Sequence, residues 1–301
     1  MINIILDLDT GIDDTLALLY VIARRDEFNL LGVTSTFGNV ETETSARNSL
    51  TILDLFGRTD VPVFIGESAP EGKTSYQVMP YIHRIHGRNG LGDVDFPRSE
   101  RKPEDESASS FIMRMIASHP DDLTIVATGP LRNLAEVYRK YPETVKIPHK
   151  VISMGGALTV EGNVTPFAEA NYYKDPKSAS FVFSLPIDLI QIPLDVTERS
   201  HLHLSDTEEW KGERGMLIRK MTEFYIGFHK KDFSYLHDPS AVCAALHPEY
   251  FSYLSLPMKI TDDGRSVGDY MADIPEKKVA VDVRTECVEE ELKRNWKKLL
   301  G

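Results

Sequence analysis

Four carboxylates fall within eight residues near the start of the chain, in the segment DLDTGIDD. They belong to Asp7, Asp9, Asp13 and Asp14, and the first basic side chain comes only at Arg24. Like charges held this close raise one another's pKa values and destabilise a fold unless a cation neutralises them. The candidate ligands are all oxygen atoms, which favours calcium or magnesium over zinc. Stabilisation by a helix dipole is the simpler alternative, and it explains one aspartate better than it explains the cluster.

A second acidic segment, LHDPSAVCAAL, lies late in the chain. Asp238 followed by Pro239 is a good helix start, so helix capping is a serious alternative interpretation of this aspartate. The neighbouring His237 favours a role in chemistry over capping alone. A histidine and a carboxylate at one helix start can supply both a proton donor and a metal ligand.

Polar groups suited to a sugar occur between these segments, in EGNVTPFAEANYYKDP. The amides of Asn163 and Asn171 and the carboxylate of Glu169 match vicinal hydroxyls, each of which donates and accepts hydrogen bonds. A turn and a helix cap explain Asn163 and Asp175 well. They leave the pairing of Glu169 with Asn171 unexplained.

Strand and helix patterns alternate along the chain and would position these groups. The run INIILDLD leads into GIDDTLALLYVIARR, and LLGVTSTFG, VPVFIG, LTIVATG and KVISMGG repeat the strand pattern with helical segments between them. This order predicts an α/β fold. We expect a single domain over residues 1–301, with a mostly parallel central sheet flanked by helices and a small β-hairpin near the C-terminus. Ligands of such sheets bind outside the carboxyl ends of the strands, where the acidic segment lies.

Two stretches interrupt the alternation. Residues 67–105 are rich in glycine, proline and charge and are predicted to form an insertion loop, which in compact domains is often a lid or a binding loop. Residues 198–236 are predicted to be largely helical. Neither has the composition of a linker between domains.

Composition and charge exclude several classes of protein. The 301 residues are 42% hydrophobic and 27% charged, and the formal net charge of −12 argues against nucleic acid and anionic membrane surfaces as partners. The two cysteines, Cys243 and Cys287, are too few for a disulfide framework or a thiolate metal site. Neither a signal peptide nor a membrane span is evident in the pattern, so a cytoplasmic protein is expected.

A competing interpretation is a haloacid-dehalogenase-type phosphatase that uses Asp7, Asp9 and magnesium. DLDTG would provide the acidic strand end, IVATG would supply Thr128, and GDYMAD would supply the later acidic pair. However, GDYMAD follows LPMKITDDG and is typical of one strand of a hairpin. This chemistry also gives no role to His237 or Asp238. Asp7, one step back on its strand, is instead expected to point into the structure and brace the loop.

Together these segments resemble the inosine-uridine nucleoside hydrolase family, whose N-terminal signature DxDxGxDD matches residues 7–14. TSTFGN, IHGRNGLG, ATGPLRNLA, SMGG, the NxTxxAExNxxxDP block, LDVT and HDP follow in the family's order, so the resemblance spans nearly the full chain. Thr10 stands where many members have proline, which leaves the carboxylates in place. The resemblance implies an enzyme that hydrolyses the N-glycosidic bond of ribonucleosides to free base and ribose.

The resemblance also implies the roles of individual residues. A calcium ion would be held by Asp9, Asp14, Asp238 and the carbonyl oxygen of Thr128, with two ribose hydroxyls and one water completing its shell. The residues that would hold the ribose hydroxyls are Asp13, Asn39, Asn163, Glu169 and Asn171. Asp9 would take the proton of that water as it attacks the anomeric carbon, and His237 would protonate the departing base.

The base pocket is less well defined by the sequence. Aromatic rings suit a flat heterocycle, and the candidates are His86, Phe167, Tyr225, Phe228 and His229. Ordinary packing is an equal alternative for each, so purine, pyrimidine or modified bases all stay open. A nucleoside-binding protein without catalysis would keep the ribose-holding residues but lose Asp9 or His237, and both are present. By family analogy we expect a homodimer or homotetramer that acts in purine or pyrimidine salvage and nucleoside catabolism.

Overall fold

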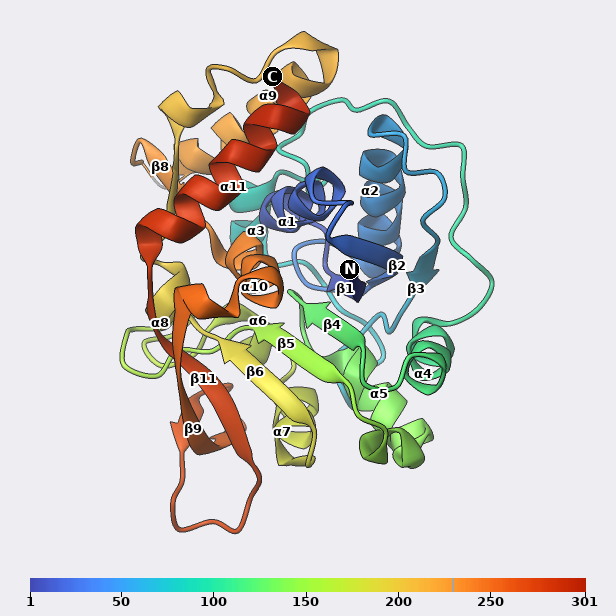
Figure 1. Ribbon diagram of the computed structural model, residues 1–301, viewed down its shortest axis with the longest axis vertical. Coiled ribbons are helices and arrows are strands. Elements are labelled where there is room, and N and C mark those ends of the chain that lie inside the picture. Colours follow the sequence, from blue (N-terminus) through green and yellow to red (C-terminus); the bar gives the residue numbers. More distant parts are fainter. Residues whose placement is uncertain (229) are drawn as a thin grey trace.

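A large β-sheet runs through the computed structural model, which describes residues 1–228 and 230–301 (Figure 1). Over these residues the strand order is β10-β9-β11-β6-β5-β4-β1-β2-β3. The strands are β1 (Ile2–Leu8), β2 (Phe28–Ser35), β3 (Val63–Ile65), β4 (Leu123–Ala127), β5 (Lys150–Met154), β6 (Asp188–Ile192), β9 (Phe251–Ile260), β10 (Ser266–Gly268) and β11 (Glu276–Val283). Because β1 lies between β2 and β4, the acidic segment at its carboxyl end lies near the middle of the sheet and away from both edge strands.

The strands from β3 across to β11 are parallel, and the other edge is antiparallel. Parallel ladders join β1 to β2 and β4, β2 to β3, β5 to β4 and β6, and β6 to β11. β9 runs antiparallel to β11, and β10 pairs with β9 so that Ser266 lies opposite Ile260. These pairings confirm the mostly parallel sheet and the C-terminal hairpin. Within GDYMAD, Gly268 ends β10 and residues 269–273 form the loop that leads to β11.

Helices cover both faces of the sheet, as Figure 1 shows. They are α1 (Ile12–Ala23), α2 (Thr42–Leu55), α3 (Pro80–His86), α4 (Ala108–Ser118), α5 (Arg132–Lys140), α6 (Ala170–Lys174), α7 (Pro176–Ser184), α8 (Leu194–Thr197), α9 (Gly212–Phe228), α10 (His237–Leu246) and α11 (Thr285–Leu300), with short 3-10 helices at Pro142–Lys146, Leu204–Thr207 and Pro248–Tyr250. Successive residues of a strand point to opposite faces of the sheet, and each face has its own hydrophobic core. Leu6 belongs to the buried cluster that includes residues of α1, α10 and α11, whereas its neighbour Ile5 belongs to the cluster that includes residues of α4, α5 and α7.

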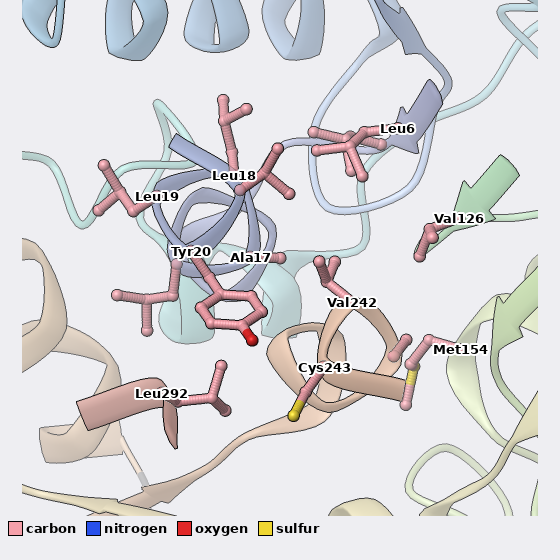
Figure 2. Packing of buried hydrophobic residues seen from close by; sticks show 14 of the residues in the cluster. Leu6, Ala17, Leu18, Leu19, Tyr20, Val126, Met154, Val242, Cys243 and Leu292 are labelled. Atoms are coloured by element: carbon pink, nitrogen blue, oxygen red, sulfur yellow. The ribbon is translucent and has the colours of Figure 1, made fainter. Parts of the chain in front are cut away.

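Helix α1 is enclosed by other elements. Every residue of Ile12–Ile22 is buried. Figure 2 shows Tyr20 of α1 with Leu292 of α11 and the side chains of α10 around it. The indole Nε1 of Trp296 in α11 donates to the carbonyl oxygen of Leu16 at 3.1 Å. The first turn of α1 is therefore held in a fixed position beside α10, against which α1 packs.

The two stretches that interrupt the alternation take different forms. Residues 67–105 contain α3, and the rest of the segment crosses the surface as loop, with Glu104 bridged to Phe64. Residues 198–236 contain α9, but the prediction of a largely helical segment is wrong at both ends. There β7 (His201–His203) and β8 (Phe233–Tyr235) form a separate antiparallel two-stranded sheet. Strands of three residues are too short to show a period of their own.

None of the helices in the described part of the chain combines the length and the apolar character that crossing a membrane would require.

Candidate active site

A cavity of about 340 Å³ lies outside the carboxyl ends of the parallel strands, at the starts of α1 and α10. Many of the residues predicted to form a site line it, namely Asp13, Asn39, His86, Thr128, Asn163, Glu169, Asn171, Tyr225, Phe228, His237 and Asp238. A larger hollow of about 570 Å³ lies at the amino ends of the strands, around Asp121 and Lys150. Its lining contains none of the residues predicted to do chemistry, so the smaller cavity is the candidate site.

Three buried carboxylates meet at this cavity. Ligand oxygens of Asp13, Asp14 and Asp238 all lie within 4.8 Å of one another. Burial and the charge of Asp14 raise the pKa of Asp13 to about 7. Burial, followed by the charges of Asp13 and Asp14, raises the pKa of Asp238 well above its usual range. A divalent cation would relieve both effects, and an all-oxygen donor set suits a hard ion. The ligand set implied by the resemblance differs from this group, because it has Asp9 in place of Asp13.

Asp9 sits behind the cavity wall and is held by three donors. The backbone N–H and side-chain Nδ2 of Asn39 donate to Asp9 Oδ2 and Oδ1 at 2.8 and 3.2 Å, and Lys174 Nζ lies 3.3 Å from Oδ2. Burial, followed by the charge of Asp14, raises the pKa of Asp9, and Lys174 opposes this rise. Gly38 must be glycine here, because a Cβ would lie 1.9 Å from Asp9 Oδ2. The loop after β2 therefore fixes the orientation of this carboxylate.

Asp14 connects α1 to the loops around it. Its Oδ2 accepts from the Gly11 backbone N–H at 2.8 Å and from Asn39 Nδ2 at 3.2 Å, and its Oδ1 accepts from Thr128 Oγ1 at 2.6 Å. Close packing explains why the signature has glycine at position 11, since a Cβ on Gly11 would lie 2.6 Å from His86 Nδ1. The same motif thus places a carboxylate in the site and leaves room for His86, at the end of α3, to lie against it.

Three of the sugar-binding candidates come from the loop before α6 and from the first turn of that helix. Glu169 is the N-cap of α6, and its carboxylate accepts backbone hydrogen bonds from Gly156 at 2.9 Å and Asn171 at 2.8 Å. Burial raises the pKa of Glu169 and these N–H donors lower it. The Asn171 amide donates to the Thr128 carbonyl at 2.6 Å, and Asn163 Oδ1 accepts from the Ala170 N–H at 2.9 Å. Helix capping therefore explains Glu169, whereas the Asn171 side chain binds the Thr128 carbonyl, and both residues also line the cavity.

His237 begins α10 on the same wall of the cavity as Asp238. Its Nδ1 lies 2.8 Å from the hydroxyl of Thr197, which is in α8. The ring centroid is 5.5 Å from that of Tyr235. This contact engages one ring nitrogen and fixes the orientation of the imidazole.

The predicted base-pocket residues are only partly brought together. His86, Tyr225 and Phe228 line the cavity, and the Tyr225 hydroxyl donates to Asp13 Oδ2 at 3.4 Å. Phe167 is not among the residues that line this cavity. It is 55% exposed, and the guanidinium of Arg265 lies 4.9 Å from the centre of its ring. His229 lies outside the described residues.

Several lining residues are not indicated by the sequence motifs. Tyr81 comes from α3, Lys174 ends α6, Glu198 follows α8, and Tyr235 ends β8. Burial is the largest single influence on the pKa of Lys174 and lowers it, but the charge of Asp9, together with Tyr76, Glu169 and Tyr81, raises this pKa above its ordinary value. A lysine at the end of a helix is typical of a solvated surface. The place of Lys174 in the site is therefore evident only from its contact with Asp9, which is far away in the sequence.

The phosphatase interpretation is not favoured by the geometry. Asp7 Oδ1 accepts from Thr34 Oγ1 at 2.6 Å and from Asn133 Nδ2 at 2.7 Å, and burial raises its pKa to about 6. Asp7 therefore braces β1 against β2 and α5, as the sequence predicts, instead of facing the cavity. In the loop after β10, Asp269 pairs with Lys259. Neither acidic group is placed for attack on a phosphate ester.

Known proteins resemble this chain over nearly its full length. The family model of the inosine-uridine preferring nucleoside hydrolases matches residues 4–294. Uridine nucleosidase 1 of Arabidopsis thaliana is 36% identical over 280 residues, which is 90% of this chain and 82% of that protein. The pyrimidine-specific ribonucleoside hydrolase RihA of Escherichia coli is 31% identical over 270 residues, which is 87% and 85% of the two chains. The solved structure of a purine-preferring ribonucleoside hydrolase from Gardnerella vaginalis has 38% sequence identity and a TM-score of 0.95, over 99% of each chain.

These relatives include both uridine or pyrimidine enzymes and a purine-preferring one, so similarity alone does not select a base. They agree on the bond that is broken. The chain belongs to the inosine-uridine preferring nucleoside hydrolase family and is a ribonucleoside hydrolase that cleaves N-glycosidic bonds.

Proposed function

We propose that the enzyme is calcium-dependent and that Asp9, Asp14, Asp238 and the Thr128 carbonyl hold the ion. The main support is the group of three buried carboxylates that includes Asp14 and Asp238. Asp9 is linked to that group through Asn39, whose Nδ2 is 3.2 Å from both Asp9 Oδ1 and Asp14 Oδ2. When bound, calcium would lower the pKa of a water molecule and orient two ribose hydroxyls.

The residues around the cavity divide the remaining tasks. We assign the ribose hydroxyls to Asp13, Asn39, Asn163, Glu169 and Asn171, which line the cavity. Asp9 accepts the proton of the attacking water as it adds to the anomeric carbon. The transition state of glycosidic cleavage is oxocarbenium-like, so the surrounding carboxylates stabilise it by their negative charge.

His237 donates the proton that the departing base needs. A nucleobase leaves poorly as an anion, and protonation by a positioned acid typically contributes about 10²–10⁴-fold to the rate. Thr197 engages Nδ1, so we assign the transfer to Nε2. The base itself would lie against His86, Tyr225 and Phe228, on the side of the cavity that α3 and α9 supply. A homodimer or homotetramer, a cytoplasmic location and a role in salvage stay predictions.

The direct test is release of reducing ribose from a panel of purine and pyrimidine ribonucleosides. The assay would be run with calcium and again after exhaustive chelation, with p-nitrophenyl phosphate as a control. We expect ribose release that disappears on chelation and returns with calcium. Activity that survives chelation would contradict the metal requirement, and phosphate release in magnesium without ribose release would support the phosphatase instead.

Calcium should stabilise the protein more as the pH rises. The pKa of Asp13 is raised to about 7 and that of Asp238 is also raised. In the metal-free protein the contribution of Asp13 to stability is therefore present at low pH and is lost as the pH rises through about 7, and that of Asp238 is lost in the same direction. Calcium needs the ionised carboxylates. At a concentration 100-fold above Kd, calcium adds about 2.7 kcal/mol, which for a chain of this length raises Tm by roughly 4 °C at pH 8 and by much less at pH 5.

Thermal denaturation at several pH values, with and without calcium, would measure this effect. Asp238→Asn removes one carboxylate of the cluster and should abolish the calcium shift at every pH. A shift of equal size at pH 5 and pH 8, or one that Asp238→Asn retains, would show that the ion binds elsewhere.

A further inference from the structure

Lys174 brings a cation into the acidic site. Its side chain is only 8% exposed, and its Nζ lies 3.3 Å from Asp9 Oδ2 and 3.4 Å from Asn39 Oδ1. It is the last residue of α6 and lines the same cavity as the carboxylates. An ion pair this well buried differs from a surface pair, because removing one partner leaves the other charged and uncompensated.

The ammonium group determines how the Asn39 amide is turned. A lysine can only donate hydrogen bonds, so the oxygen of the amide must face Lys174 and the Nδ2 must face away from it. That Nδ2 then lies 3.2 Å from Asp9 Oδ1 and 3.2 Å from Asp14 Oδ2, where it donates to both carboxylates. One lysine thereby orients an amide that connects the two aspartates.

The same lysine also completes the hydrogen-bond set of Asp9. Oδ2 receives the Asn39 backbone N–H at 2.8 Å as well as the ammonium, and Oδ1 receives the Asn39 amide. Both oxygens thus have donors at defined positions, and the plane of the carboxylate is fixed. A general base gains from this arrangement, because proton transfer depends on placing a lone pair within hydrogen-bond reach of the water.

Helix α6 connects this arrangement to the sugar side of the cavity. Glu169 caps the helix, Asn171 lies in its first turn and Lys174 ends it. The segment that carries the proposed ribose ligands therefore also carries the cation that holds Asp9. A ribose bound to Glu169 and Asn171 would sit at a set distance from the Asp9 carboxylate.

We propose that Lys174 is a positioning residue for the Asp9 base: it fixes the Asp9 carboxylate and the Asn39 amide in the orientation that proton abstraction requires. This role rests on the proposed function of Asp9. Lys174 adds positive charge next to a cation site, so it does not serve to attract calcium. Its loss should reduce turnover without weakening metal binding.

The test compares Lys174→Met with wild type and with Lys177→Met, which removes an exposed lysine on the neighbouring helix α7. Removing a group that supports a reactive residue typically costs about 10–100-fold in activity. We expect a loss of that size in kcat at saturating calcium, equal for a nucleoside and for p-nitrophenyl riboside, with little change in KM. Titration calorimetry on metal-depleted protein should give a calcium Kd equal to or below that of wild type. Lys177→Met should match wild type in each measurement.

A second variant distinguishes loss of the ammonium group from misfolding. Lys174→Ala leaves space that opens to the cavity, and added ethylammonium should restore part of kcat in a saturable way, whereas tetramethylammonium, which has no N–H donor, should not. A crystal structure of Lys174→Met should show the Asp9 carboxylate or the Asn39 amide turned from its wild-type orientation.

Three results would overturn the assignment. They are wild-type kcat in Lys174→Met, a loss that is fully recovered at higher calcium, and an unchanged orientation of both Asp9 and Asn39 in the crystal structure. Wild-type enzyme that releases no ribose would instead contradict the proposed function, and the crystallographic comparison would still decide what Lys174 does.

Discussion

Replacing Asp9 with asparagine should leave a folded protein that has lost about 10²–10⁴-fold in kcat at saturating calcium, the usual contribution of one well-placed acid or base. Asparagine has the size of aspartate, so the close approach of Gly38 and the hydrogen bond from the Asn39 N–H can persist. An amide cannot accept the proton of the attacking water. The expected consequence is a loss of turnover without a loss of fold.

Steady-state kinetics on the preferred nucleoside would measure this loss. Asp9 is also a proposed calcium ligand, so the calcium Kd must be determined and kcat measured well above it. Asp26→Asn removes an exposed aspartate just beyond α1 and serves as the matched control. A Tm close to that of wild type would exclude unfolding as the cause. Wild-type kcat in Asp9→Asn would remove Asp9 as the base.

The second large effect should depend on the leaving group. His237→Ala should lower kcat by about 10²–10⁴-fold on nucleosides, because the departing base then leaves without a proton donor. p-Nitrophenolate is a stable anion and needs no proton, so p-nitrophenyl riboside should lose far less. The ratio of the two losses isolates proton donation from any effect on sugar binding, since both substrates carry the same ribose.

Parallel kinetics on both substrates would supply this ratio. His203→Ala is a suitable control, because His203 lies in β7, where its partner is the surface residue Asp232 and not a cavity residue. Equal losses on the two substrates would mean that His237 acts through binding or structure. In that case another group in the cavity would have to supply the proton.

The strength of the sequence patterns explains how much of the fold can be predicted. Strands buried on both faces give continuous apolar runs, so the parallel sheet and its flanking helices are evident from sequence. The β7–β8 pair is not, since two three-residue strands separated by α9 have no detectable period. The hairpin at β9 and β10 is predictable because LPMKITDDG ends in a turn signal directly before the second strand.

Motifs and geometry contribute differently to the site. The aspartates of DLDTGIDD and the HDP segment are identified by type and spacing, and their convergence follows from the carboxyl ends of the strands. Lys174 could not be identified in this way, because its partner Asp9 is 165 positions away. Phe167 shows the opposite case, in which an aromatic residue within a site motif faces solvent. Neither the pairing nor the outward turn has a local sequence signal.

The enclosure of α1 has a consequence for synthesis of the protein on the ribosome. Beyond its first turn this helix is apolar and buried on every side, and it is translated long before α10 and α11, which enclose it. The nascent chain must therefore carry an uncovered hydrophobic helix for most of its elongation, a state prone to aggregation. Asp238 lies in α10, so the proposed metal site cannot form until that helix has been made. Chains that end before α10 should be substrates for chaperones and proteases instead of partly active enzymes.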